Sequence, residues 1–261
     1  MILIRSLISI FILLNYLVLE QNILAQDFIK NAHSHNDYLN KRPLFNALEN
    51  KFKSIEVDVF LSKTKLLVGH NRLQLKKNRT IETLYLDPLW DLFLSNNGRI
   101  YENNIPLYLL VDIKTSAIET YSTLQKVLDS YEPMLSYVEA DSLIYRAVTI
   151  IISGNRPGII DLKTIKKRNV FIDGRFSDVG QHISNKLMPL ISSNWKENFK
   201  WNGVGLFPEN ELNDHINNTW GDTGKAIFNN WLGLVYGLTS HDRLQQYMDE
   251  VDPKNPLGIK I

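Results

Sequence analysis

The chain reads Leu-Tyr-Leu-Leu-Val-Asp-Ile-Lys at residues 107–114 and Ser-Ile-Glu-Val-Asp-Val at residues 54–59. Each stretch is an apolar run of strand length, rich in β-branched residues and interrupted by charged residues near its end. Side chains alternate between the two faces of a strand, so Glu56 and Asp58 project to one side and Asp112 and Lys114 do the same on their own strand. The apolar neighbours are left for the opposite face, where helices can cover them.

Similar runs recur along the chain, and longer stretches with helical spacing separate most of them. We predict strands at 28–35, 54–61, 66–70, 107–114, 147–153, 170–173, 187–192 and 226–231, with helices such as 118–128 and 161–168. Strands that alternate with helices indicate parallel βαβ units. A barrel and an open doubly wound sheet fit this rhythm equally well. The polar residues favour the barrel, because the carboxyl-end mouth of a β/α barrel is where charged side chains gather.

Histidines lie at the same predicted strand ends. The first strand ends in Asn-Ala-His-Ser-His-Asn-Asp at 31–37, and His70 ends the stretch Leu-Leu-Val-Gly-His. His33 and His35 share one face of their strand. Three carboxylates from two strands make a site for a hard cation such as Mg²⁺ or Ca²⁺, and histidines beside it can serve as acid and base. Lys114 adds a fixed positive charge suited to phosphate oxygens.

Composition narrows the class of protein further. The 261 residues carry 29 Lys and Arg against 28 Asp and Glu, a net charge of +1, so the whole chain lacks the electrostatic footprint of a nucleic-acid-binding protein. Cysteine is absent, which excludes disulfides, thiolate metal sites and a cysteine nucleophile. The sequence leaves the oligomeric state open.

The first residues predict a secretory signal. A short segment with Arg5 precedes an apolar run at 6–19, and Ala25 is a plausible cleavage residue. We therefore predict a signal peptide at 1–25, one domain at 26–261, and a secreted or periplasmic protein.

The order and spacing of the motifs resemble those of the phospholipase-C-like phosphodiesterase superfamily, which includes glycerophosphodiester phosphodiesterases and sphingomyelinase D enzymes. The similarity is greatest to the branch with a Ser-His-Asn-Asp-Tyr signature, related to the altered-inheritance-of-mitochondria family. The matching stretches include 32–38, 54–58, 66–70, 110–114 and 152–157, and the resemblance covers about residues 27 to 205. It implies a single (β/α)8 TIM-type barrel, here with a short or irregular last strand.

The resemblance also implies roles for individual residues. Glu56, Asp58 and Asp112 would hold one Mg²⁺ or Ca²⁺ ion. His35 would be the base, His70 the acid that protonates the leaving alkoxide, and Lys114 would hold phosphate oxygens. His33 is the second candidate for the base, because it fits the Ala-His opening of the glycerophosphodiesterases, whereas His35 fits the gap to the acidic pair in sphingomyelinase D. The substrate would be a small-molecule or lipid phosphodiester, with transient contact to a membrane surface and without a nucleic-acid partner.

Two other functions compete with the phosphodiesterase. His33-x-His35 is also similar to the metal pair of amidohydrolase-type barrels, a reading that leaves Glu56 and Asp58 without a role. The third hypothesis is a non-catalytic barrel that binds phosphodiesters. It rests on the C-terminal region, where 226–238 and 258–261 depart from the last strands of the family.

Overall fold

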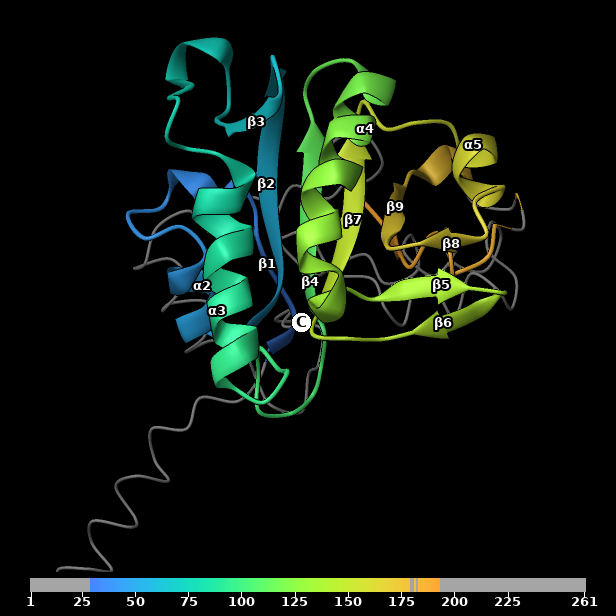
Figure 1. The fold of residues 1–261 in the computed structure, drawn as a ribbon, viewed down its shortest axis with the longest axis horizontal. Helices are drawn as coiled ribbons and strands as arrows, with labels where there is room; N and C mark the ends of the chain where they lie inside the picture. Colours follow the sequence, from blue (N-terminus) through green and yellow to red (C-terminus); the bar gives the residue numbers. More distant parts are fainter. Residues whose placement is uncertain (1–28, 179–180, 182, 193–261) are drawn as a thin grey trace, which may run out of the picture.

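The computed structural model describes residues 29–178, 181 and 183–192, and a seven-stranded sheet forms its centre (Figure 1). Six strands lie side by side in parallel, in the order β1 (Ile29–Ser34), β2 (Phe52–Ser62), β4 (Leu107–Ile113), β7 (Val148–Gly154), β9 (Val170–Gly174) and β10 (Leu190–Ile191). The seventh, β3 (Lys65–Val68), pairs antiparallel with the last residues of β2. All carboxyl ends of the parallel strands therefore meet at one edge of the sheet.

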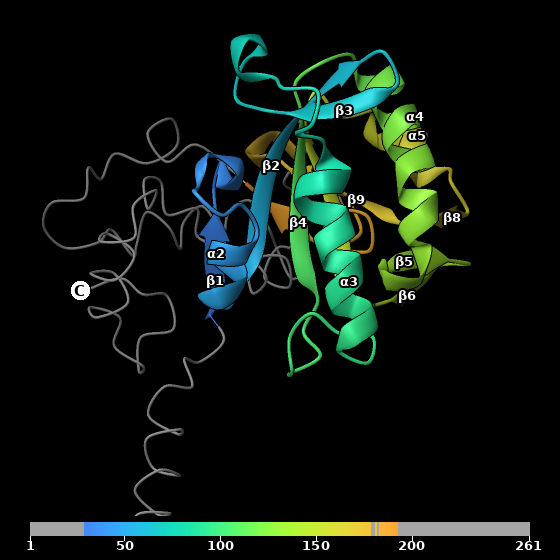
Figure 2. The same cartoon turned by 60° about the vertical axis from the view of Figure 1, so that its left-hand side comes forward.

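Helices cover the outer face of this sheet. The described α-helices are α2 (Phe45–Glu49), α3 (Asp87–Ser95), α4 (Ala117–Leu128) and α5 (Ile159–Lys163). Figures 1 and 2 show α3 and α4 lying along the same side of the sheet. Within α4 the buried residues are Thr120, Leu124 and Leu128, spaced four apart, which places them on one side of the helix. Shorter turns lie at Asp37–Leu39, Arg72–Gln74, Glu82–Leu86, Asp129–Met134 and Phe176–Asp178.

The two faces of the sheet carry different residues, as the alternation in the sequence predicted. Ile55, Val57, Val111 and Ile113 face the helices and belong to the main hydrophobic core. A smaller apolar cluster on the opposite face includes Tyr108, Leu110, Ile151, Phe171 and Leu190. Asp112 and Ser153 follow Leu110 and Ile151 on the same inner face, two residues closer to the carboxyl edge.

The prediction of a closed (β/α)8 barrel is wrong. The sheet curls into a half-barrel, and among the described residues no strand joins the outer edge of β1 to that of β10. Closure of an eight-stranded barrel needs such pairing at both edges, together with a helix after each strand. Here β10 has two residues, and the described connection from β9 to β10 contains a 3-10 turn without an α-helix.

One predicted helix also needs correction. The helix predicted over 161–168 is the shorter α5, because Lys167 and Arg168 form β8 and pair with β5 (Tyr137–Glu139). Together with β6 (Ser142–Ile144), these strands make a small second sheet that the sequence pattern did not predict.

No helix in the described part of the chain is long and apolar enough to cross a membrane. The predicted signal at 1–25 and the predicted strand at 226–231 lie outside the described residues.

Candidate active site

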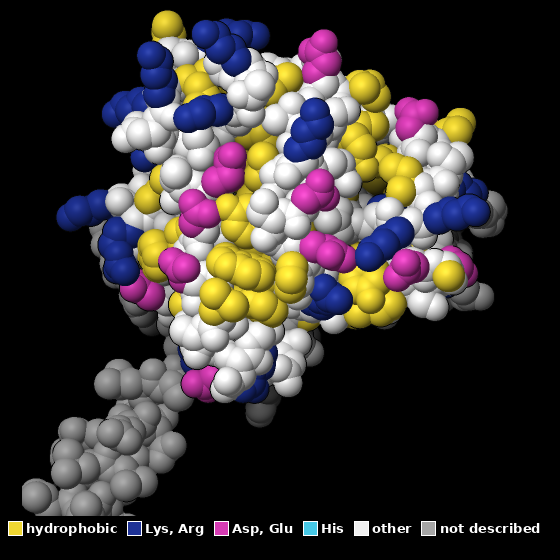
Figure 3. All heavy atoms as spheres, viewed as in Figure 1, with side chains coloured by type: hydrophobic (Ala, Val, Ile, Leu, Met, Phe, Trp, Pro, Cys, Tyr) yellow, Lys and Arg dark blue, Asp and Glu magenta, His cyan; other side chains and the backbone are white. Residues whose placement is uncertain are grey.

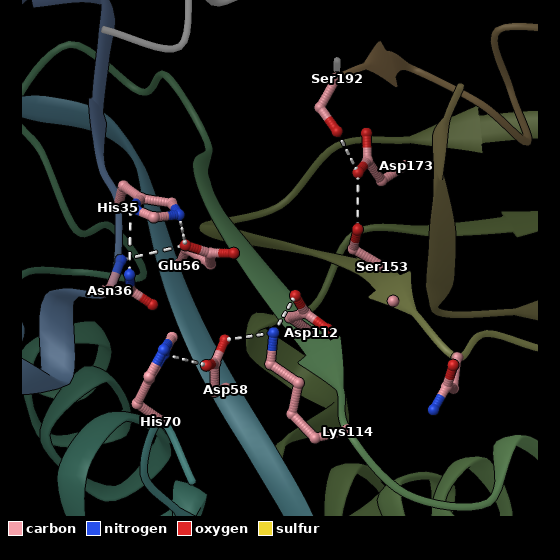
Figure 4. A network of polar contacts seen from close by, with 12 residues as sticks. His35, Asn36, Glu56, Asp58, His70, Asp112, Lys114, Ser153, Asp173 and Ser192 are labelled. Atoms are coloured by element: carbon pink, nitrogen blue, oxygen red, sulfur yellow. Dashed lines mark hydrogen bonds and ion pairs between the residues drawn. The ribbon is translucent and has the colours of Figure 1, made fainter. Parts of the chain in front are cut away.

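A row of polar side chains crosses the inner face of the sheet near its carboxyl edge. Asp58 of β2 is paired with Asp112 of β4, and Asp112 is paired with Ser153 of β7. Ser153 in turn donates a hydrogen bond to Asp173 of β9, at 2.7 Å. Because the strands are parallel and in register, residues far apart in the sequence occupy one level of the sheet. Glu56 lies two residues before Asp58 and so on the same face (Figure 4).

Glu56, Asp58 and Asp112 come together as the sequence predicted. One carboxylate oxygen from each lies within 4.8 Å of the others. Oxygen ligands bound at about 2.0–2.6 Å from a Mg²⁺ or Ca²⁺ ion lie at most about 5 Å from one another, so these positions fit a single cation. Asp112 Oδ1 is buried without a hydrogen-bond partner, which leaves it available as a ligand. The donor set is all oxygen and therefore suits a hard cation.

The backbone around Asp112 is shaped to leave room for its carboxylate. Gly154, at the end of the neighbouring strand β7, has φ +64°, and a Cβ atom there would lie 2.0 Å from Asp112 Oδ1. Any other residue at this position would displace the carboxylate and adopt an unfavourable backbone conformation.

Electrostatics also favour a cation at this position. Burial raises the pKa of Glu56 to about 7, with added repulsion from Asp58 and Asp112. Burial likewise raises the pKa of Asp58. Three carboxylates confined in a buried space repel one another, and a divalent cation would remove that repulsion.

Lys114 is the cation that the described residues place among these acids. Its Nζ lies 2.6 Å from Asp112 Oδ2 and 3.2 Å from Asp58 Oδ1. Burial alone would lower the pKa of Lys114, but the hydrogen bond and charge of Asp112, together with the charge of Asp58, outweigh burial and raise it. The ammonium has three donors, so a direction remains for a phosphate oxygen after these two contacts.

His35 and His70 each lie beside one of the acids. His35 Nε2 lies 3.3 Å from Glu56 Oε2, and His70 Nδ1 lies 3.4 Å from Asp58 Oδ2. Burial lowers the pKa of His35, which keeps the imidazole neutral near pH 7. The side chain of His70 is 56% exposed, so this ring stands at the solvent side of the site.

The structure separates His33 from this group. Its Nδ1 lies 2.8 Å from Ser54 Oγ in the interior, and burial lowers its pKa to about 3. The centres of the His33 and His35 rings are 6.4 Å apart. His33 is thus a neutral interior residue below the site, whereas His35 contacts Glu56 directly.

Two polar residues of the site had no role in the sequence analysis. The Tyr38 hydroxyl donates to Asp58 Oδ2 at 2.7 Å and lies 3.3 Å from His70 Nδ1. The backbone N–H of Asn36 donates to Glu56 Oε2 at 3.0 Å. Both belong to the stretch His-Ser-His-Asn-Asp-Tyr at 33–38, which was the signal that could have found them.

The other end of the polar row is a second buried carboxylate. Asp173 Oδ2 accepts hydrogen bonds from Ser153 Oγ at 2.7 Å and from Ser192 Oγ at 2.6 Å, whereas Oδ1 is buried without a partner. Burial raises the pKa of Asp173 to about 6. Two arginines lie near this end of the row: Arg156 donates to the backbone carbonyl of Asp173, and Arg175 donates to that of Gly154.

Comparisons with known proteins show which sequences this chain is similar to. Residues 21–173, more than half of the chain, match the sequence model of the AIM6-like phosphodiesterase domain. The altered inheritance of mitochondria protein 6 of Eremothecium gossypii is 30% identical over 184 residues, covering 62% of this chain and 47% of that protein. A homoserine O-succinyltransferase of Methylobacter tundripaludum is 58% identical over 91 residues, which is 34% of this chain and 24% of that protein. The chain thus spans less than half of each of these two relatives.

A solved structure is also similar. A phosphatidylinositol-specific phospholipase C from Listeria monocytogenes matches 50% of this chain and 54% of its own, with a TM-score of 0.35 and 11% sequence identity. The relationship to phospholipase-C-like phosphodiesterases indicated by the motifs is confirmed by the family match and by the relative from Eremothecium gossypii. The chain belongs to the family of AIM6-like phosphodiesterase domains.

Proposed function

We propose that the protein is a phosphoric diester hydrolase that depends on one divalent cation, Mg²⁺ or Ca²⁺, and cleaves a P–O bond in a lipid or glycerol phosphodiester. The observation that carries this proposal is the placement of two histidines, one beside Glu56 and one beside Asp58, at three convergent carboxylates, with Lys114 between Asp58 and Asp112 (Figure 4). The family match supports phosphodiester chemistry in general. The predicted signal at 1–25 supports a secreted or periplasmic location.

The residues divide the chemistry between them. Glu56, Asp58 and Asp112 would hold the cation, which when bound supplies positive charge to the phosphate oxygens. Lys114 Nζ, already held by two carboxylates, would donate its remaining N–H to a phosphate oxygen and stabilise the charge that develops in the transition state.

The two histidines would transfer the protons. His35, neutral at physiological pH, would accept the proton of the attacking hydroxyl, which comes from water or from the substrate itself. The P–O bond to the leaving group then breaks, and His70, at the open side of the site, would donate a proton to the departing alkoxide. Tyr38 would hold Asp58 and the His70 ring in place through its contacts with both.

The geometry does not support an amidohydrolase-type site. That site would need His33 and His35 to converge on one metal, whereas His33 Nδ1 is engaged with Ser54 in the interior. His35 instead approaches Glu56, which the amidohydrolase hypothesis leaves unused.

The test is hydrolysis of bis(p-nitrophenyl) phosphate by the full chain, first with EDTA and then with Mg²⁺, Ca²⁺ or Zn²⁺ added back. We expect Mg²⁺ or Ca²⁺ to restore activity, and Lys114→Met to abolish it. Lys167→Met is the matched control, because Lys167 makes its 3.0 Å ion pair with Glu132 at the surface. Substrate binding without turnover would favour the non-catalytic hypothesis, and activity with Zn²⁺ alone would contradict the proposed cation site.

A further inference from the structure

One segment of the chain carries a large excess of positive charge. Between Asp58 and Glu82 the sequence has no Asp or Glu and six Lys or Arg residues, at 63, 65, 72, 76, 77 and 79. The net charge of the whole protein is +1, so this segment departs strongly from the average. We call residues 63–79 the basic loop. It comprises the turn between β2 and β3, then β3 itself, and then the turn Arg72–Gln74.

The basic loop lies at the carboxyl edge of the sheet, where the candidate active site opens. β2 runs past Asp58 to this edge, β3 returns beside it, and His70 follows directly. Figure 3 shows Lys and Arg side chains gathered at the upper left of the molecule, where Figure 1 places β3 and the turn beyond it. Lys63, Lys65, Arg72, Lys76 and Lys77 are all exposed.

The apex of the basic loop is an exposed leucine in a structured turn. Leu73 is 97% exposed, more than any other large apolar residue exposed in the described part of the chain. Its backbone N–H donates to Asn71 Oδ1 at 3.0 Å, and the N–H of His70 donates to Gln74 Oε1 at 3.0 Å. At the C-terminal end of the basic loop, the Arg79 side chain donates a hydrogen bond to the backbone carbonyl of Tyr38 at 2.7 Å. Hydrogen bonds within the turn and at its base therefore hold Leu73 outward.

We propose that the basic loop docks the protein on an anionic lipid bilayer, with Leu73 entering the interface and the surrounding cations contacting acidic head groups. Each Lys or Arg near an anionic membrane surface contributes favourable binding energy, and an exposed apolar side chain adds to it by leaving water. The loop and the site share one edge, so a bound bilayer would lie beside the catalytic groups. This docking deepens the proposed function by naming a lipid in a membrane as the source of the phosphodiester.

Positive charge alone would also suit a nucleic acid as the partner of the basic loop. The exposed Leu73 favours the lipid bilayer. A nucleic-acid contact places cations and large aromatic rings against phosphates and bases, and the loop has no Phe, Tyr or Trp. An exposed aliphatic side chain in a segment rich in Lys and Arg is stabilised by insertion between lipid head groups.

The experiment uses the absence of native cysteine. Leu73→Cys in the full chain is labelled with an environment-sensitive fluorophore and titrated with phosphatidylcholine vesicles with and without phosphatidylglycerol, in EDTA. Ile160→Cys is the matched control, because Ile160 is a 79% exposed apolar residue on α5 next to exposed Lys163 and Lys166. We expect a blue-shifted, brighter signal at position 73 only, only with phosphatidylglycerol, and reversed by high salt.

A second measurement tests the charges. Lys76→Gln with Lys77→Gln should weaken the vesicle titration at position 73 by about 30-fold, whereas Lys163→Gln with Lys166→Gln should change it less than about twofold. Equal signals at positions 73 and 160, a response to neutral vesicles, or a response to single-stranded RNA but not to vesicles would overturn the proposal. Vesicle binding in EDTA and hydrolysis of a soluble diester are separate readouts, so a failure of docking is distinguishable from a failure of the proposed catalysis.

Discussion

Asp173→Asn should stabilise the protein at neutral pH, which is unusual for a substitution at a buried, hydrogen-bonded residue. Asp173 is 3% exposed, and burial raises its pKa from 3.8 to about 6. The folded protein therefore keeps a proton between pH 3.8 and about 6 that the unfolded chain releases, so stability falls as the pH rises through this window. This difference in pKa between the folded and the unfolded chain corresponds to a loss of stability of about 3 kcal/mol. The loss is complete above pH 6 and absent well below pH 3.8.

The asparagine avoids this cost because it does not titrate. Its carbonyl can still accept from Ser153 and Ser192, and its amide group replaces Oδ1, which has no partner to lose. The test is to measure the free energy of unfolding of both proteins by urea denaturation. The value for the variant minus the value for the wild type should rise by about 2 kcal/mol between about pH 4.5 and about pH 7.5. The lowered pKa of His33 acts on both proteins and cancels in the difference.

Asp37 provides the contrast. It is also fully buried, but both of its oxygens accept hydrogen bonds, from Ser34 and Asn40 on one side and from Leu44 N and Tyr85 on the other. Asp37→Asn must turn an amide toward donors and should cost about 1–3 kcal/mol. If the stability difference between Asp173→Asn and the wild type did not change with pH, or fell as the pH rose, the assignment of a desolvated carboxylate at Asp173 would be refuted.

Four further variants test the site. His35→Ala and His70→Ala should each lower turnover of a soluble phosphodiester by about 100-fold or more, with metal affinity measured by calorimetry within a few-fold of wild type, since neither is a proposed ligand. Asp58→Asn should weaken Mg²⁺ or Ca²⁺ binding as well as turnover, and unchanged affinity would remove Asp58 from the ligand set. Gly154→Ala should lower metal affinity by roughly tenfold although it removes no ligand, because its Cβ would press on Asp112 Oδ1, and an unaffected titration would contradict that contact.

The local elements could be predicted from the sequence because they depend on local patterns. Alternation within 54–59 and 107–114 fixed the faces of β2 and β4, and the structure places Glu56, Asp58 and Asp112 together as expected. Closure of the sheet could not be predicted in this way, since it depends on pairing between strands at opposite ends of the domain. β8 was missed for a similar reason, because only its pairing with β5 makes Lys167 and Arg168 a strand.

Side-chain roles within the site were only partly accessible. His33 and His35 share a face and are two residues apart, so alternation alone could not separate them, and the difference is depth below the sheet edge. Tyr38 was missed because its role depends on a hydroxyl that reaches Asp58, twenty positions away in the sequence. Periodicity reports which face a residue takes and does not report what its terminal atom contacts.

The sheet limits which insertions and deletions the site can accept, because it aligns Asp58, Asp112, Ser153 and Asp173 in one row. These residues are aligned by backbone pairing between neighbouring strands, so deleting one residue within β4 would turn Asp112 toward the helices and Ile113 toward the site. Insertions in the loops beyond the strands leave that pairing untouched. New substrates are therefore accessible through changes of loop length and composition around an unaltered frame, whereas the reacting groups tolerate no shift of register.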